Sequence, residues 1–233
     1  MIDFHTHVLP CVDDGSQSME ESLAMLSAMR EQGVTTVIAT PHFYANDDSI
    51  DSFLARRDGA YASLASACEN APRIILGAEV KYYEGISRLP DLKKLRINGT
   101  RLLLLEMSMS RWSEDAVREV LDIAGQGRII PVLAHVERYL FAQKKETVTR
   151  LLESGVLFQA NSSFVTERRS WRKAITMIKE EQIHFLGSDC HDLTDRPPNV
   201  AKAFSYIQKK LGDAVVEDYM DYQRALFAQS LKN

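Results

Sequence analysis

Histidine and acidic residues recur along this chain of 233 residues at the ends of short apolar runs, where a metal ion could use them. Imidazole and carboxylate groups without thiolate favour Mn, Fe or Zn in a catalytic site over a structural zinc site. If the apolar runs are parallel strands, their ends meet at one edge and these side chains converge there. The pattern therefore predicts a polynuclear metal site. Its members are His5, His7, His42, Glu79, Glu106, His135, Asp189 and His191.

Two of these residues, His5 and His7, are two positions apart on an expected strand, so their side chains point to the same face. A shared metal ion requires this arrangement, although a single H-x-H pair is also compatible with two ordinary histidines. Asp189 and His191 repeat the same spacing after the last expected strand.

Glu106 is the harder residue to explain without a metal. Four leucines precede it, and a glutamate carried into a core needs a cation or a proton. Glu79 follows its own apolar run and raises the same requirement. An ion pair with an arginine is the alternative for either residue, and a metal is favoured when all the positions are taken together.

Two further positions need separate treatment, one because its ligand is ambiguous and one because it does not fit the pattern. In the Asp13-Asp14-Gly15 turn, either aspartate could ligate while the other caps the turn at Gly15. His184 precedes its expected strand, so we expect it at the opposite end of the sheet, in a structural role.

The apolar runs alternate with stretches of helical periodicity, which predicts a parallel sheet with right-handed crossovers. About seven such units suit a barrel better than an open sheet, and no linker divides the chain, so residues 1–233 are expected to form one domain. We expect strands near 2–5, 35–39, 74–79, 102–106, 130–134, 156–160 and 184–188, and helices near 18–32, 113–125, 144–154, 170–180, 199–211 and 215–231.

The composition, with 45% apolar and 26% charged residues, is that of a globular protein, and no run is long enough to cross a bilayer. The net charge of −4 and the lack of a basic tract argue against a nucleic-acid partner. No secretory leader is visible, and Cys11, Cys68 and Cys190 show no paired spacing. A reducing cytoplasm is therefore expected.

Seven motifs resemble those of the polymerase-and-histidinol-phosphatase (PHP) superfamily. Within it, the resemblance is to the bacterial manganese-dependent tyrosine phosphatases found with capsule and exopolysaccharide kinases. The motifs are Asp3-Phe4-His5-Thr6-His7, Asp13-Asp14-Gly15, Thr40-Pro41-His42, Gly77-Ala78-Glu79, His135-Val136-Glu137-Arg138-Tyr139, Gln159-Ala160-Asn161-Ser162-Ser163 and Ser188-Asp189-Cys190-His191 through Arg196-Pro197-Pro198.

This resemblance implies a distorted (β/α)7 TIM-like barrel with three divalent ions, most consistently Mn²⁺, with Fe or Zn as alternatives. It selects Asp14 over Asp13 as a ligand and assigns phosphate binding to Arg138 and Arg196, for which surface salt bridges with Glu137 or Asp195 are the alternative. The implied ligand sets are His5, His7, Glu79 and Asp189 for the first ion, Glu79, Glu106 and His135 for the second, and Asp14, His42 and His191 for the third. A glutamate at position 106, where most of the superfamily has histidine, is the variant of the tyrosine-phosphatase group.

The activity implied is hydrolysis of protein tyrosine phosphate, in which a metal-activated hydroxide attacks phosphorus in line. The implied substrate is a bacterial tyrosine autokinase that controls capsule or exopolysaccharide synthesis. The alternatives are a PHP-type small-molecule phosphatase, such as one acting on histidinol phosphate, a phosphodiesterase, or a metal-dependent binding module. The Cys190 to Arg196 spacing imitates a cysteine-dependent phosphatase loop, but acidic residues inside it oppose phosphate binding.

The sequence leaves two groups of residues with two interpretations each. Residues 161–163 (Asn161, Ser162 and Ser163) could contact ligands or phosphate, or form a polar turn. The aromatic residues of the expected mouth loops could line a wall for the phosphotyrosine ring, or pack those loops. These aromatic residues are Phe43, Tyr44, Tyr82, Tyr83 and Trp112.

Overall fold

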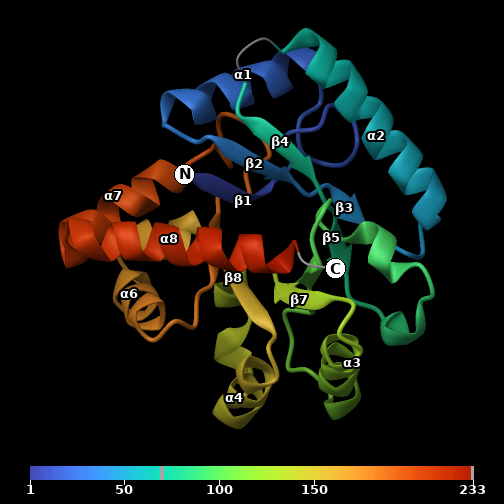
Figure 1. The fold of residues 1–233 in the computed structure, drawn as a ribbon, viewed down its shortest axis with the longest axis vertical. Coiled ribbons are helices and arrows are strands. Elements are labelled where there is room, and N and C mark those ends of the chain that lie inside the picture. Colours follow the sequence, from blue (N-terminus) through green and yellow to red (C-terminus); the bar gives the residue numbers. More distant parts are fainter. Residues whose placement is uncertain (69–70, 232–233) are drawn as a thin grey trace.

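The computed structural model describes residues 1–68 and 71–231 as alternating strands and helices (Figure 1). The strands are β1 (Ile2–Thr6), β2 (Thr36–Ala39), β3 (His42–Phe43), β4 (Arg73–Leu76), β5 (Glu79–Lys81), β6 (Leu102–Glu106), β7 (Ile130–Leu133), β8 (Leu157–Asn161) and β9 (Phe185–Gly187). The α-helices are α1 (Met19–Glu31), α2 (Ile50–Ala67), α3 (Glu114–Gly125), α4 (Lys145–Glu153), α5 (Ser162–Thr166), α6 (Trp171–Lys179), α7 (Val200–Leu211) and α8 (Asp213–Ser230). Short 3₁₀ helices cover Ile86–Arg88, Leu92–Leu95, Val136–Arg138 and Leu140–Ala142.

All the strand pairs are parallel, in the orders β1-β2-β4 and β3-β5-β6-β7-β8-β9. The sheet curls so that β1 meets the chain beyond β9, where Thr6 bridges Cys190 and the Asp189 N–H donates to the His5 carbonyl over 2.8 Å. The predicted α/β fold with a parallel sheet is therefore confirmed, the sheet being curled, and the barrel of seven strand–helix units stays a prediction. Parallel strands place all their carboxyl ends on one side.

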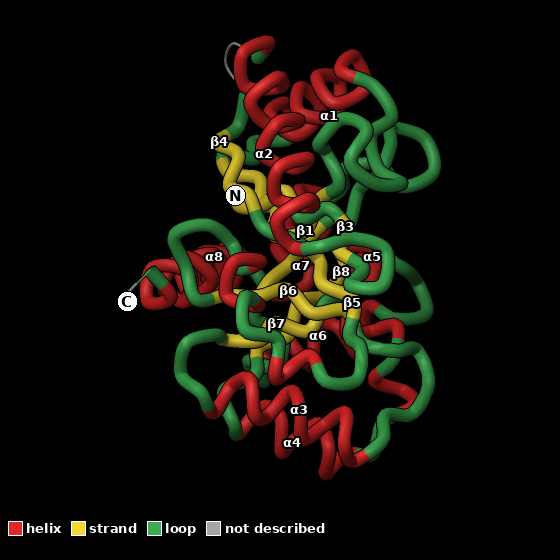
Figure 2. The backbone as a smooth tube through the Cα atoms, turned by 90° about the vertical axis from the view of Figure 1, so that its right-hand side faces the viewer, coloured by secondary structure: helices red, strands yellow, loops and turns green. Residues whose placement is uncertain are grey.

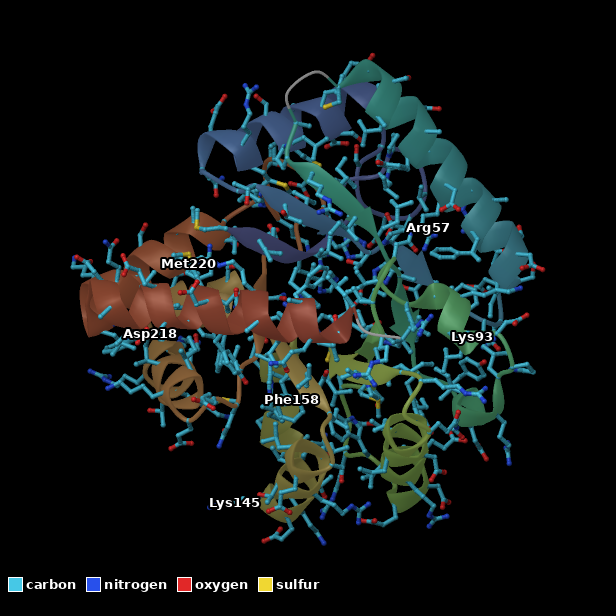
Figure 3. All side chains as sticks on the ribbon, in the orientation of Figure 1. Arg57, Lys93, Lys145, Phe158, Asp218 and Met220 are labelled. Carbon is cyan, nitrogen blue, oxygen red and sulfur yellow. The ribbon has the colours of Figure 1, made fainter. Side chains whose placement is uncertain are left out.

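Two of the expected strands are interrupted. β2 stops before Pro41 and resumes as β3, and β4 stops before Gly77 and resumes as β5. The Gly77 carbonyl accepts a hydrogen bond over 3.0 Å from the buried guanidinium of Arg57 on α2, which is labelled in Figure 3. His42 and Glu79 consequently follow the ends of β2 and β4, as predicted, and each is also the first residue of a second strand segment, which was not predicted.

An apolar cluster fills the interior of the curled sheet, with Phe4 of β1 stacked on Phe185 of β9 at a ring-centroid distance of 3.8 Å. Leu226 and Phe227 of α8 pack against this cluster from the amino ends of the strands. Figure 2 shows α8, β4 and both chain ends on one side of the molecule, and β5 on the other side. The opposite side, where the strands end, is left to the loops.

The first strand contains an irregularity that serves the strand-end side. The register of β1 against β2 shifts between Asp3 and Thr6, as it does at a β-bulge. In a regular strand neighbouring side chains point to opposite faces. The shift lets Phe4 pack in the interior while the adjacent His5 turns toward the strand ends.

The six helices expected from the sequence are present within two residues of their predicted bounds, but α2 and α5 were missed. Helix α2 buries Phe53, Arg57 and Leu64 and otherwise consists largely of small and charged residues, so its apolar stripe is weak. Helix α5 is a five-residue helix that begins directly after β8. The polar turn that was one interpretation of Ser162 and Ser163 is in fact this short helix.

His184 lies at the amino end of β9, away from the other histidines. It is buried, its Nδ1 accepts the Phe158 N–H over 2.9 Å, and its ring lies 6.3 Å from that of Tyr222 on α8. Burial lowers the pKa of His184 from 6.5 to about 4. The predicted position at the opposite end of the sheet is therefore confirmed.

The lowered pKa of His184 predicts a pH-dependent loss of stability. Between pH 6.5 and about 4 the unfolded chain binds the proton and the folded chain does not, so folding stability falls as pH falls through this window. At 1.36 kcal/mol per pKa unit, about 2 kcal/mol is lost between pH 7.5 and 5. In urea unfolding, the His184→Asn variant should lose about 2 kcal/mol less than the parent between these two pH values. Equal losses would show that His184 is not buried in its neutral form.

Gly187 at the end of β9 permits a close approach of β1. A Cβ at this position would lie 2.6 Å from the His5 Cβ and 2.8 Å from the His5 nitrogen. No backbone or side-chain rearrangement short of moving β1 relieves such an overlap.

The Gly187→Ala variant should therefore be destabilised by about 1–3 kcal/mol in urea unfolding. Gly59→Ala is the matched control, because Gly59 lies within α2 and a Cβ there would meet nothing within 4 Å. Alanine favours helix, so this control should gain about 0.5–1 kcal/mol. A neutral Gly187→Ala variant would contradict the close packing of β1 on β9.

Candidate metal centre

The structure brings the nine predicted metal ligands together at the carboxyl ends of the strands. Glu79 is at the centre, with its Oε2 atom 3.1 Å from His5 Nε2, 3.1 Å from His42 Nδ1 and 3.4 Å from His7 Nε2. His5 Nε2 and His7 Nε2 are 3.0 Å apart, so the predicted sharing of one face is confirmed. Three imidazoles thus surround one buried carboxylate.

Three groups of side chains could each hold a cation, since one ligand atom from every member lies within 4.8 Å of the others. Two of the groups contain the predicted sets for the first and third ions, the third-ion set with His7 added. The remaining group joins Glu79 and Glu106 to His42, where the resemblance implied His135. The three groups are His5, His7, Glu79 and Asp189; His7, Asp14, His42 and His191; and His42, Glu79 and Glu106.

His135 nevertheless lies against the same two carboxylates. Its Nε2 atom is 2.8 Å from Glu79 Oε1 and 3.7 Å from Glu106 Oε1. Lys81 Nζ lies 3.0 Å from the other Glu106 oxygen, Oε2. Lys81 was not singled out from the sequence, although its place two residues after Glu79 on a strand puts it on the same face.

Several buried donor atoms of this centre have no hydrogen-bond partner among the described residues. They include Glu79 Oε2, His42 Nδ1 and His191 Nε2, which point into the centre where the imidazoles meet the carboxylates. Glu79 Oε2 and His42 Nδ1 lie 3.1 Å apart without a hydrogen bond between them, and buried charged groups are normally hydrogen-bonded or coordinate metals. The donor set of imidazole nitrogens and carboxylate oxygens therefore fits divalent cations.

The ionisation of the carboxylates agrees with this fit. Burial alone would raise the pKa of Glu79, but the imidazoles of His5 and His135 outweigh it and hold the pKa well below its usual value. Burial is likewise outweighed at Asp189, where His5 and His7 hold the pKa well below its usual value. Both side chains are therefore charged at neutral pH and ready to bind cations.

Asp189 divides its two oxygens between two functions. Its Oδ1 atom lies 3.4 Å from His5 Nε2, while Oδ2 accepts from Arg138 over 2.5 Å, Arg196 over 2.8 Å and the Asn161 amide over 2.9 Å. Each arginine side chain is more than a third exposed, at 37% for Arg138 and 38% for Arg196. The two arginines thus line the entrance to the centre.

The surface salt bridges considered as an alternative for the arginines are not formed among the described residues. The Glu137 carboxylate accepts the Asn161 N–H over 3.3 Å instead of pairing with an arginine. Asn161 is buried and contacts Asp189, so of its two interpretations the one that places it at the site agrees with the structure.

Asp13 supports the imidazole of His7 on the side of the ring that faces away from Glu79. Asp13 contacts His7 Nδ1 over 2.6 Å, and it also accepts the N–H groups of Gly15 and His42 over 3.0 and 2.8 Å. It is therefore the turn-capping aspartate, while the neighbouring Asp14 is exposed and places Oδ1 3.5 Å from both His42 Nε2 and His191 Nε2.

Gln159 contacts two other histidines of the centre, His5 and His135. Its Oε1 atom accepts the His135 N–H over 2.7 Å and lies 3.2 Å from His5 Nδ1. No role was predicted for Gln159 from the sequence. A glutamine between Phe158 and Ala160 in a buried run is nevertheless a signal for a buried polar contact.

Two residues of the centre adopt left-handed backbone conformations. His135 has φ of 32° and Asp189 has φ of 54°, values that are uncommon outside glycine. Both follow the ends of strands, where the turn of the chain aims their side chains at Glu79 and at the arginines. Such strain persists only where the surrounding structure enforces it, and it is concentrated at functional sites.

Most of the aromatic residues considered for a substrate wall pack the loops instead. Phe43 is buried against Phe53, and the indole N–H of the buried Trp112 donates to the Ser108 carbonyl over 2.9 Å. Tyr82 donates to Glu119 on α3, and Tyr83 packs against the outer core.

Tyr44 alone among these five is exposed, at 40%, and its ring stacks on His42 at 5.2 Å. Burial and the charges of Glu106 and Asp14 raise its pKa to about 12, so its hydroxyl stays protonated. Of the five residues, Tyr44 is therefore the one positioned to meet a substrate.

Cys190 cannot act as the nucleophile that its spacing from Arg196 imitates. It is fully buried, and burial raises the pKa of its thiol well above the usual value. Catalytic thiolates need a lowered pKa and access to substrate. The interpretation of this spacing as coincidence agrees with the structure. Cys11 and Cys68 are also free thiols.

Comparison with known proteins assigns this chain to a family. Residues 1–225 match the family model described as capsular polysaccharide synthesis, CpsB/CapC. The chain belongs to the CpsB/CapC family. The resemblance inferred from the motifs is thereby confirmed. The matched range includes the positions of all nine predicted ligands and of Arg138 and Arg196.

Named relatives of this CpsB/CapC chain are described as tyrosine phosphatases. The tyrosine-protein phosphatase CpsB of Streptococcus pneumoniae is 30% identical over 248 residues, covering 99% of this chain and 100% of the relative. The tyrosine-protein phosphatase YwqE of Bacillus subtilis (strain 168) is 28% identical, covering 91% and 85%. A solved structure of YwqE and CpsB, described as unique metal-dependent tyrosine phosphatases, has a TM-score of 0.82 at 25% identity and covers 98% of this chain and 94% of its own.

The contacts of Asp13 predict that it controls metal affinity without binding the metal. Partners behind a ligating histidine typically change metal affinity by about 10- to 100-fold when removed. Asp13→Ala should weaken binding of Mn²⁺ by about this factor in calorimetric titration. Asp195→Ala, an exposed aspartate of the loop after β9, is the control and should bind as the parent does. Unchanged affinity in Asp13→Ala would show that His7 needs no such support.

Proposed function

We propose that this chain is a metal-dependent protein-tyrosine phosphatase, a phosphoric monoester hydrolase. The observation that carries the proposal is the buried Glu79 carboxylate, whose Oε2 atom makes no hydrogen bond and is surrounded by three imidazole nitrogens, beside an aspartate that holds two arginines. The family membership and the tyrosine-phosphatase relatives support the same activity. The relatives give no such support to a small-molecule phosphatase such as one for histidinol phosphate.

We further propose that the centre holds three divalent ions, most consistently Mn²⁺. His5, His7, Glu79 and Asp189 would hold one, and Asp14, His42 and His191 another. Glu79 and Glu106 would share the remaining ion with His135, whose Nε2 lies close to both carboxylates. Bound ions of this kind activate a water nucleophile and neutralise charge on phosphate.

The chain's own residues bind and orient the phosphate. Arg138 and Arg196 present partly exposed guanidinium groups, the geometry that suits the oxygens of a phosphate dianion. The Asn161 amide beside them holds Asp189 in place. Together they fix the ester so that its bridging oxygen faces outward, and they stabilise the charge that develops on the non-bridging oxygens.

Departure of the tyrosine side chain needs little assistance. The pKa of a free tyrosine hydroxyl is about 10, so phenolate is a fair leaving group. The Tyr44 ring at the entrance offers a face to the leaving ring, because aromatic pairs favour offset or edge contacts.

Two finer features belong to the same proposal. We take β2 with β3, and β4 with β5, as single interrupted strands, which gives seven strand positions around a single PHP-type barrel domain. We also propose a bacterial tyrosine autokinase as the phosphoprotein substrate, in keeping with the family's description in capsular polysaccharide synthesis. Among the described residues no helix is long and apolar enough to span a membrane, and the cytoplasmic location stays a prediction.

Phosphate release from a phosphotyrosyl peptide tests the activity. The parent protein in Mn²⁺ should release phosphate, and EDTA should abolish the release until Mn²⁺ is restored. Arg138→Ala should lower kcat/KM by about 100-fold or more, because it removes a charged donor from the phosphate oxygens. Arg118→Ala, an exposed arginine of α3, is the matched control and should leave the rate unchanged.

Histidinol phosphate is the comparison substrate in the same assay. Faster turnover of histidinol phosphate than of the peptide would overturn the assignment of protein tyrosine phosphate as the substrate. Activity that persists in EDTA would overturn the metal-dependent mechanism. Binding of the peptide with no release of phosphate would identify a binding module instead of an enzyme.

A further inference from the structure

Large apolar side chains that are exposed to solvent are concentrated around the entrance to the metal centre. Within residues 1–68 and 71–231, five such side chains are at least 40% exposed, namely Tyr44, Met109, Phe141, Leu193 and Leu231. Single exposed apolar residues are ordinary, but a concentration on one face marks an interaction site. The first four all lie in loops that follow the carboxyl ends of strands.

Each of these four side chains lies within three residues of a residue of the centre. Tyr44 follows His42 of β3, Met109 follows Glu106 of β6, and Phe141 follows Arg138. Leu193 lies between His191 and Arg196 in a turn closed by the bond from the His191 N–H to the Arg196 carbonyl over 3.0 Å. The exposed apolar side chains are therefore held close to residues of the centre.

The order of the strands places the four side chains in two pairs on opposite sides of the centre. β6 and β7 are neighbours, so Met109 and Phe141 share one side. Their loops are joined by Gln143, which accepts the Trp112 N–H and donates to the Ser110 carbonyl, each over 3.1 Å.

The second pair lies across the centre from the first. β1 lies between β2 and the chain that follows β9. Tyr44 follows β3, in which β2 resumes, and Leu193 follows β9, so these two residues flank the loop after β1. A chain segment that brings one ester group to the metals would therefore meet apolar side chains before and after that group.

The charges on these loops differ between the two pairs. Asp47, three residues after Tyr44, and Asp195, two after Leu193, are exposed, whereas Arg111, two after Met109, and Lys144, three after Phe141, are exposed cations. The guanidinium groups of Arg138 and Arg196 are directed at Asp189 inside the entrance, where phosphate would bind. Charge therefore favours neither an acidic nor a basic segment, while apolar residues would meet apolar surface on both sides.

We propose that Tyr44, Met109, Phe141 and Leu193 form a docking rim that binds the residues on both sides of phosphotyrosine in a protein substrate and selects apolar residues there. The inference rests on the proposed phosphatase activity and adds the class of sequence on which it acts. Phe141, 76% exposed, is the principal contact, because it has the most surface to remove from water.

Three phosphotyrosyl peptides that differ only in the flanking residues test the rim. The peptide with leucine on both sides of phosphotyrosine should be hydrolysed with a kcat/KM about tenfold above those of the peptides with serine or aspartate. The double variant Met109→Ala/Phe141→Ala should lower the leucine peptide to the level of the serine peptide. Phe141→Leu, which keeps an apolar side chain, should retain most of the preference.

Leu231→Ala is the matched control, since Leu231 is 49% exposed, between Met109 at 44% and Phe141 at 76%, but directly follows α8, which packs at the amino ends of the strands. It should leave all three rates unchanged. Tyr44 is not substituted, because its ring stacks on His42.

Hydrolysis of p-nitrophenyl phosphate, which lacks flanking residues, separates the two proposals. If the parent hydrolyses this ester but treats the leucine and serine peptides alike, or if the double variant keeps the preference, the docking rim is wrong and the phosphatase activity stands. If the parent hydrolyses neither this ester nor any of the peptides in Mn²⁺, the proposed function itself fails.

Discussion

The buried negative charge of Glu79 is the constraint on which the rest of this structure depends. A carboxylate removed from water must be paired, and here histidines of β1 and β3 and the turn after β7 surround it. Asp189 repeats the arrangement, with imidazoles at one oxygen and three donors at the other. The core below the centre can be wholly apolar because these contacts confine the buried charge to the strand ends.

The backbone departs from regular strand geometry where the centre requires it. The bulge in β1, the interruptions before β3 and β5, and the positive φ angles of His135 and Asp189 all lie within the layer of residues that meets Glu79. Regular alternation would turn some of these side chains toward the helices. The buried hydrogen bond from Arg57 to the Gly77 carbonyl stabilises one of these departures. The irregularities are therefore part of the site and not defects of the sheet.

The two ends of the sheet are used differently. At the amino ends, α8 covers the interior cluster, and His184 is held neutral between Phe158 and Tyr222. At the carboxyl ends no helix of comparable length covers the mouth among the described residues, and loops carry both the ligands and the exposed apolar side chains. The same opening that admits a phosphate ester to the metal centre therefore exposes it to the residues around that ester.

The strand–helix alternation, the parallel sheet and eight of the nine residues at its mouth could be predicted from the sequence, because hydrophobic periodicity and polar residues near strand ends are local signals. The ninth, Asp14, was chosen over Asp13 only by the family resemblance. The sequence could not place α2, whose apolar stripe is weak, nor the breaks that turn His42 and Glu79 into the first residues of new strand segments. Only the tertiary structure showed that Asp13 and Gln159 support the histidines, that Cys190 is inaccessible, and that four of the five candidate aromatic residues pack inward while Tyr44 does not. These outcomes depend on contacts between residues far apart in the chain, and no local pattern encodes which of two similar side chains such a contact will bury.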